Sequence, residues 1–253
     1  MPRQLAEKAA TGKVLAGLLP SVALFRQENT FERLGHFGIA VRGRARSALL
    51  FSTKPIRQLE GATIAITEET STTVCLLRLL LEQRYQVIPA AYDRVRVPPL
   101  LAGVDEGVPP VPSGGEGTPK AEGWSGQAPK ADALLLIGDE ALRFKQTDTQ
   151  YPFEIDVGFE WWLWQHVPFV FAVWAIRKDA SPQDKKQIEL GLARSLSTNL
   201  TQLDAIAQEQ ASGFGIPAEE LETYLSGFVY RLGQDEEQGI KRFRELINEH
   251  HLL

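Results

Sequence analysis

The longest apolar stretch of the chain is GFEWWLWQHVPFVFAVWAIR, at residues 158–177, and it holds four of the five tryptophans. Its apolar run from Val167 to Ile176 is ten residues long and contains Pro168. A membrane-spanning helix needs about 18 apolar residues, so this run is too short to cross a bilayer. β-Branched and aromatic side chains dominate it, which is typical of a strand covered on both faces. We therefore predict a buried strand over 167–176 and no membrane segment.

Three tryptophans precede that strand, at positions 161, 162 and 164. Positions i, i+1 and i+3 of a helix cannot all lie on one face. We therefore expect at least one of these rings to face a cleft or solvent, while most aromatic residues of the strand pack in the core.

Earlier in the chain, short apolar runs alternate with segments of helical periodicity. The runs predict strands at residues 14–19, 45–53, 62–67, 85–90 and 131–138. Helices are predicted at residues 3–11, 20–28 and 68–84, the last with Val74, Leu77 and Leu81 on one face. The strand–helix–strand order over 62–90 indicates a parallel pair with a right-handed crossover.

The chain after residue 180 is predicted to be helical. Ser181 and Pro182 favour a helix start, and Ile240, Phe243 and Leu246 lie on one face of the last segment. The helical segments are 181–200, 201–215, 216–228 and 233–253. The whole pattern predicts an α/β protein with a helical C-terminal part.

Residues 98–130 are rich in proline and glycine and show no periodicity, which predicts a long flexible insertion. Apolar strands bracket the middle strand–helix block, so we expect two lobes with the chain crossing over and returning. The first lobe would combine residues 1–50 with 175–253, and the second would comprise 51–174. A cleft between such lobes is a natural ligand site.

Composition narrows the class of partner. The net charge of −5 argues against nucleic acid, which requires a basic face. A single cysteine, Cys75, excludes an intrachain disulfide and fits a reducing, cytoplasmic setting. It lies within TVCLLRLLL, so we interpret it as a small buried hydrophobe, with a reactive thiol as the alternative.

The common catalytic signatures GxGxxG, GxxxxGK[ST], GxSxG and HExxH are absent. None of the four histidines has metal-ligand spacing, so we predict neither a metal nor a cofactor. His166, next to the tryptophans, is a minor candidate for contact with a ligand.

An anion-binding pattern remains at the start of the predicted helix over 68–84. Ser71, Thr72 and Thr73 supply hydroxyls there, and the first N–H groups of a helix attract a carboxylate. The alternative is simple helix capping by Thr70 or Ser71.

Two further candidates flank predicted strands. Arg42, Arg44 and Arg46 precede one strand; alternation would point them to one face, where they could bind carboxylates bidentately. A solvated edge is the alternative. Asp139 follows the strand over 131–138, where α/β sheets keep functional residues; helix capping is the alternative.

Five segments together resemble the chorismate dehydratase family of the futalosine route to menaquinone. The resemblance runs in order from about residue 2 to the end, outside 98–130, and implies a two-lobed fold similar to type II periplasmic-binding proteins in a cytoplasmic enzyme. The segments are RSALLFS, ETSTTVCLLRLLL, ALLLIGDEAL, DVGFEWWLWQHVPFVFAVWAIR and YRLGQDEEQGIKRFRELINEHHL.

The resemblance implies a lyase that removes water from chorismate and leaves 3-[(1-carboxyvinyl)oxy]benzoate. Because aromatisation is steeply downhill, the enzyme need only orient this dicarboxylate, move a proton and help hydroxide leave. A substrate carboxylate could act as the base. On this resemblance Ser47 is the catalytic hydrogen-bond donor, and Ser71, Thr72 and Thr73 hold a carboxylate of the substrate. The residue pattern adds Arg46 and Asp139 as further substrate-binding residues.

The chain departs from the family in two places. Members open with a strand–helix unit carrying Tyr-Leu-Asn, whose Asn belongs to the active site, and the resemblance begins after it. Members also carry an Asp-Gly-Pro-type turn where this chain has RGRA. The alternatives are a non-catalytic small-anion-binding module and the sister enzyme 1,4-dihydroxy-6-naphthoate synthase. The segments around Ser47, Asp139 and Trp174 favour the dehydratase.

Overall fold

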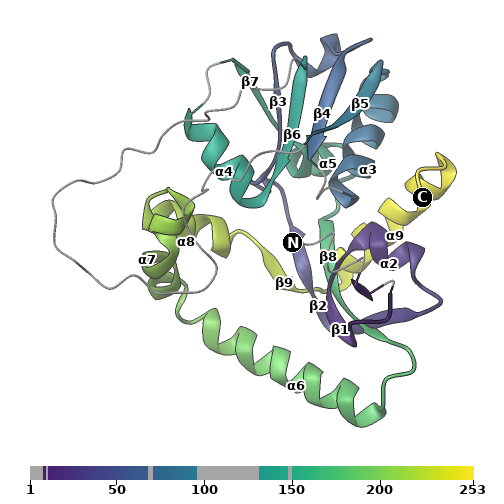
Figure 1. Ribbon diagram of the computed structural model, residues 1–253, viewed down its shortest axis with the longest axis vertical. Helices are drawn as coiled ribbons and strands as arrows, with labels where there is room; N and C mark the ends of the chain where they lie inside the picture. Colours follow the sequence, from purple (N-terminus) through teal and green to yellow (C-terminus); the bar gives the residue numbers. More distant parts are fainter. Residues whose placement is uncertain (1–7, 10, 68–70, 96–130, 148–149) are drawn as a thin grey trace, which may run out of the picture.

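The computed structural model describes residues 8–9, 11–67, 71–95, 131–147 and 150–253. The segment 98–130, predicted as an insertion, and most of the helix predicted over 3–11 lie outside them. Two sheets, with helices packed against them, make up the described part (Figure 1). Among its helices, none combines the length and the apolar character that a membrane crossing requires.

The first sheet is antiparallel, with strand order β1-β8-β2-β9. Because β8 lies between β1 and β2, the prediction that its apolar segment forms a buried strand is confirmed. β2 was not predicted, since its ladder with β8 shifts register between Arg33 and Gly38 and this breaks the apolar alternation. The strands are β1 (Ala16–Pro20), β2 (Phe31–Val41), β8 (Phe169–Arg177) and β9 (Val229–Arg231).

The second sheet has strand order β5-β4-β6-β3-β7. β4 pairs in parallel with both β5 and β6, so a parallel strand–helix–strand unit is present, although its second strand, β5, lies just beyond the predicted range 62–90. β3 is antiparallel to both of its neighbours, β6 and β7. The strands are β3 (Ala48–Ser52), β4 (Thr63–Thr67), β5 (Ala91–Val95), β6 (Ala133–Ile137) and β7 (Phe153–Asp156).

The strand predicted over 85–90 is wrong, because β5 begins only at Ala91. The preceding helix widens into a π-helical turn, η2 (Leu80–Tyr85), and Gln86 closes it in the left-handed region at φ 55°. The Val87 N–H donates to the Leu81 carbonyl at 2.8 Å. These residues therefore terminate a helix and are not free to pair in a sheet.

One hydrophobic core joins the two sheets. Trp161 on α5, Phe169 on β8 and Phe243 on α9 pack edge to face with ring centroids 4.9–5.9 Å apart. Trp161 is fully buried, whereas the other two tryptophans of α5 are partly exposed. The helices around this core are α2 (Ser21–Arg26), α3 (Thr72–Leu79), α5 (Val157–Gln165) and α9 (Gln234–Glu249).

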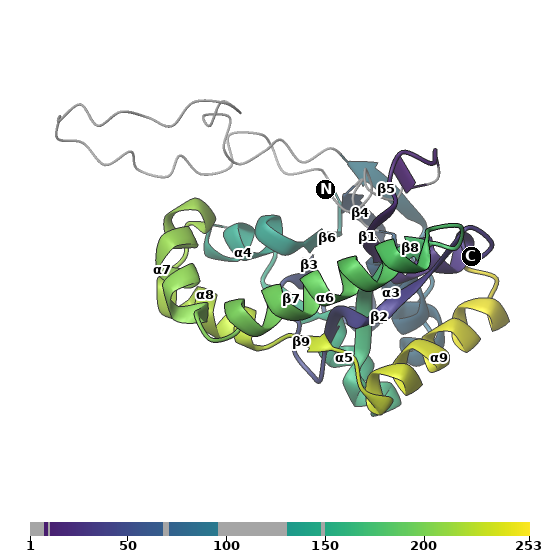
Figure 2. The same ribbon diagram turned by 90° about the horizontal axis from the view of Figure 1, so that it is seen from below.

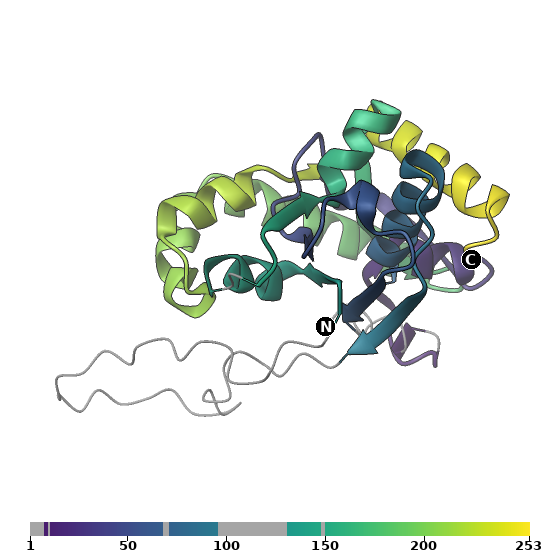
Figure 3. The same ribbon diagram turned by 90° about the horizontal axis from the view of Figure 1, so that it is seen from above.

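The predicted helical C-terminal part is present, and it does not form one layer. α7 and α8 lie at one end of the molecule and α9 at the other (Figures 2 and 3). Leu142 of α4 packs with Ile216 and Leu221, so the α7–α8 pair is anchored on the second sheet's helix. The remaining helices are η1 (Ile56–Gln58), α4 (Gly138–Thr147), α6 (Pro182–Asn199), α7 (Leu203–Phe214) and α8 (Ala218–Ser226).

The division into lobes 1–50 plus 175–253 and 51–174 stays a prediction. Its boundaries fall inside β3 and β8, while sheet pairing keeps β3 whole in one sheet and β8 whole in the other. Lobes drawn along the sheets would instead meet in the connections 42–47 and 166–168.

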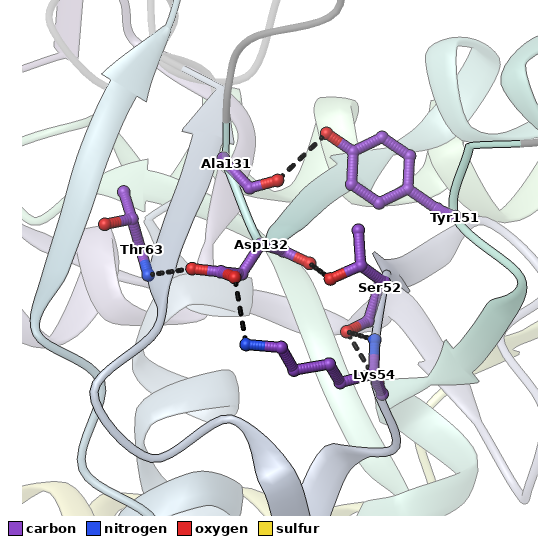
Figure 4. Close-up of polar contacts among 7 residues, drawn as sticks. Ser52, Lys54, Thr63, Ala131, Asp132 and Tyr151 are labelled. Carbon is purple, nitrogen blue, oxygen red and sulfur yellow. Dashed lines mark hydrogen bonds and ion pairs between the residues drawn. The ribbon is translucent and has the colours of Figure 1, made fainter.

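Asp132 fastens the start of β6 to its neighbours (Figure 4). Its carboxylate accepts hydrogen bonds from the Thr63 N–H at 3.0 Å and from the Lys54 ammonium at 3.2 Å. Its carbonyl accepts from the Thr53 N–H at 2.9 Å. The Thr63 amide, and then the Lys54 ammonium, hold the pKa of Asp132 below its usual range.

We expect Asp132→Ala to lower the free energy of unfolding by about 1 kcal/mol, because it removes two hydrogen bonds from a partly exposed carboxylate. Asp132→Asn is the matched control, since it keeps the shape and loses only the charge. A depressed folded-state pKa gives stability above the unfolded-state pKa that is lost as the pH falls through the folded-state value. The difference between wild type and Asp132→Asn should therefore shrink in urea titrations as the pH drops below about 4; a constant difference would contradict this explanation.

Candidate functional site

A cavity of about 160 Å³ lies where the two sheets meet. It is smaller than the roughly 300–1,000 Å³ of pockets for drug-sized ligands, so it suits a small compound. Among the described residues that line it, none carries a charged side chain. The lining residues are Pro20, Ile39, Ala45, Ser47, Ala48, Ser71, Thr72, Thr73, Ile137, Gly138, Phe171, Ala172, Tyr224 and Phe228.

Ser47 lies on the wall of this cavity, immediately before β3. Its side chain is buried, and its Oγ lies 2.9 Å from the Tyr224 hydroxyl. Its carbonyl accepts a hydrogen bond from the Gly138 N–H at 2.7 Å, which ties the start of β3 to the start of α4. Its predicted catalytic role stays a prediction.

Asp156 holds the connection that precedes Ser47. Its carboxylate is buried and accepts from the N–H groups of Ala45 at 3.1 Å and Arg46 at 2.8 Å. It also caps α5 by accepting from the Phe159 N–H at 3.0 Å. The carboxylate therefore fixes the backbone one residue before Ser47, where Arg46 adopts a left-handed φ of 64°. Sequence reasoning missed Asp156, although an aspartate just before an apolar helix is a capping signal.

The hydroxyl-rich start of α3 lines the same cavity, but its three side chains are not equivalent. Thr72 Oγ1 accepts from the Val22 N–H at 3.2 Å and so supports the start of α2. Ser71 makes no side-chain capping bond to its own helix. The N–H groups of the first turn of α3 have no partner within their helix and attract negative charge. Substrate binding by Ser71, Thr72 and Thr73 stays a prediction.

None of the three arginines lines the cavity. Arg42, Arg44 and Arg46 are all exposed and alternate with buried Gly43, Ala45 and Ser47, which supports the alternative of a solvated edge, although 42–47 is not an extended strand and Gly43 and Arg46 have positive φ. Arg42 pairs with the buried Glu236 at 2.8 Å, and the Arg44 guanidinium lies 4.4 Å from the Phe159 ring centroid. Arg46 is exposed, so its predicted substrate contact finds no support in the cavity.

Asp139, His166 and Cys75 also lie outside the cavity lining. Asp139 is exposed in the first turn of α4, and its predicted substrate contact stays a prediction. His166 is exposed at the end of α5, at a left-handed φ of 58°. Cys75 is buried, which raises the pKa of its thiol, and the interpretation as a buried hydrophobe is confirmed. In the described ranges no His, Cys, Asp and Glu side chains gather in a metal-binding group.

Among the polar side chains of the described cavity lining, Tyr224 on α8 is the one that sequence reasoning missed. Burial raises the pKa of its phenol, which therefore stays protonated near neutral pH. It lies 177 positions from its partner Ser47, so no local pattern could have paired them.

A sequence model of the family described as "Menaquinone biosynthesis" matches residues 1–108 and 118–249. The match includes most of the predicted insertion 98–130, and within that insertion residues 109–117 have no counterpart in the family model. The chorismate dehydratase of Thermus thermophilus is 27% identical over 261 residues, which cover 98% of this chain and 84% of that protein.

Solved structures share the fold. The crystal structure of an Archaeoglobus fulgidus protein has a TM-score of 0.70 at 19% identity and covers 100% of this chain and 85% of that one. The periplasmic aliphatic sulphonate-binding protein of Escherichia coli has a TM-score of 0.61 at 13% identity and covers 99% and 80%. The predicted periplasmic-binding-protein-like fold is thereby confirmed. The chain belongs to the menaquinone biosynthesis family.

Proposed function

We propose that this chain dehydrates chorismate to 3-[(1-carboxyvinyl)oxy]benzoate. The observation that carries the proposal is the cavity itself, in which the Ser47 hydroxyl shares one small space with the hydroxyl-rich start of α3. The relative from Thermus thermophilus bears the name of this activity, which supports the choice of reaction.

The uncharged lining suits a dehydration in which the protein itself does not accept the proton. Tyr224 is the titratable side chain among the described lining residues, and burial raises its pKa. A phenol that remains protonated is a poor general base. The proton that the ring loses would therefore pass to one of the substrate's own carboxylates, while Ser47 donates a hydrogen bond to the departing hydroxide. The hydroxide and that proton then leave together as water.

The other carboxylate needs a counterpart that is not a lining cation. The first N–H groups of α3 and the hydroxyls of Ser71 and Thr73 meet that need, because a helix start carries partial positive charge. Exposed Arg46 would act on substrate approach rather than on the bound state.

Turnover tests the proposal directly. Incubation of the purified chain with chorismate should yield an aromatic product with the mass of chorismate minus water, followed by absorbance and mass spectrometry. The Thermus thermophilus enzyme, assayed in parallel, is the positive control. Absence of product under conditions in which the control is active would contradict the proposed enzymatic activity.

The lack of a general base among the described lining residues also favours a second candidate, a non-catalytic module that binds small anions. Calorimetric titration with chorismate separates the two. Saturable binding without product would identify the module, whereas binding followed by product identifies the dehydratase.

A further inference from the structure

We propose that Tyr224 is a positioning residue that sets the direction in which the Ser47 hydroxyl donates its hydrogen bond. The inference rests on the proposed function, since it assigns Ser47 a donor role towards the departing hydroxide. It deepens that function by adding a residue from α8 to a site otherwise built from the two sheets and α3.

The hydroxyls of Ser47 and Tyr224 form a hydrogen-bonded pair at the cavity wall. Ser47 Oγ and the Tyr224 hydroxyl are 2.9 Å apart, and both residues line the cavity. Within the described part of the chain, neither of these two side-chain oxygens makes a further hydrogen bond. Each hydroxyl carries one proton, so one of them donates within the pair and the other keeps its proton for the cavity.

The chemistry of the two groups decides which one donates. A phenol is more acidic than an aliphatic alcohol and is therefore the stronger donor and the weaker acceptor. Tyr224 then donates to Ser47 Oγ, and the Ser47 proton points into the cavity. Consecutive hydrogen bonds polarise one another, so the Ser47 O–H becomes a better donor to a leaving hydroxide.

The surroundings of Tyr224 keep its ring in this place. Phe228 packs edge to face against it with ring centroids 5.0 Å apart. The α7–α8 pair is anchored on α4 by its apolar cluster and by the Arg143 guanidinium, which donates to the Gly213 carbonyl at 2.6 Å. Since α4 begins at Gly138, whose N–H donates to the Ser47 carbonyl, the same helix anchors both members of the pair.

The test compares Tyr224→Phe, Ser47→Ala and the double variant in chorismate turnover. Tyr224→Phe keeps the ring and removes one oxygen, and should lower kcat about tenfold while KM changes less than about threefold. Ser47→Ala should lower kcat further. The double variant should equal Ser47→Ala within about twofold, because Tyr224 acts through the hydroxyl that is already missing.

Tyr230→Phe is the matched control. Its hydroxyl donates to the Leu225 carbonyl at 2.8 Å and lies outside the cavity lining. This control should leave kcat within about twofold of wild type, and near-UV circular dichroism should show that all variants keep the native packing.

Three results would overturn the proposal. A kcat for Tyr224→Phe equal to that of Tyr230→Phe would show that the phenol does nothing in the reaction. A double variant whose loss is the product of the single losses would show that Tyr224 acts independently of Ser47. A wild-type chain without turnover would remove the proposed function itself and, with it, the role of Tyr224. The first two results leave the proposed function standing, so the two failures are distinguishable.

Discussion

Ser47→Ala is expected to lower kcat for chorismate about a hundredfold, while KM changes by less than about threefold. The hydroxyl would donate to charge that develops only as hydroxide departs, so its loss falls on the transition state and not on the bound substrate. Alanine leaves the short β3 start intact, because the carbonyl of residue 47 still accepts from the Gly138 N–H. Steady-state kinetics with product absorbance would measure both constants.

Ser52→Ala is the matched control on the same strand. Ser52 is fully buried at the other end of β3, and its Oγ donates to the Lys54 carbonyl at 2.7 Å. This variant should lose about 1 kcal/mol of unfolding free energy and keep kcat, since Ser52 lies outside the cavity. If Ser47→Ala kept the kcat of Ser52→Ala, Ser47 would not be the catalytic donor.

Gly239→Ala is expected to destabilise the chain by more than about 3 kcal/mol. Gly239 is buried on α9, and a Cβ atom there would lie 2.0 Å from the carbonyl oxygen of Pro168, immediately before β8. The clash is with backbone, so no side-chain rotation can relieve it. α9 or β8 would have to move, at the expense of the core around Trp161 and Phe169.

Gly191→Ala is the control for the intrinsic effect of alanine. Gly191 is exposed on α6, and a Cβ atom there would meet nothing within 4 Å. Alanine is the better helix former, so this variant should gain up to about 1 kcal/mol. Urea unfolding of both variants gives the comparison, and equal shifts in the midpoint would contradict the steric explanation.

The local sequence pattern was sufficient to predict those helices and strands whose defining residues are neighbours in the chain. A continuous apolar run located β8, and apolar periodicity with helix-start residues located α3 and the C-terminal helices within a few residues, because each of these signals lies inside one element. It failed over 85–90, where a π-helical turn and a left-handed Gln86 use up residues whose composition is that of a strand.

The residues of the candidate site were likewise predicted only in part. The family resemblance pointed to Ser47 and Ser71–Thr73, and the fold brings these residues to one cavity. The residue pattern also pointed to Arg46 and Asp139, whose exposed side chains lie outside the cavity lining. The predicted alternation is present over 42–47, where the three arginines are exposed, but none of the three lines the cavity.

The sequence by itself determined the fold class, the central strand and the hydroxyl-bearing segments, because each depends on residues that are neighbours in the chain. Only the tertiary structure decided that Tyr224 meets Ser47, that Asp156 clamps the connection before it, and that Arg42 is neutralised by Glu236. These partners lie between 110 and 194 positions apart. Contacts of that range arise from the packing of whole elements, and no local periodicity records them.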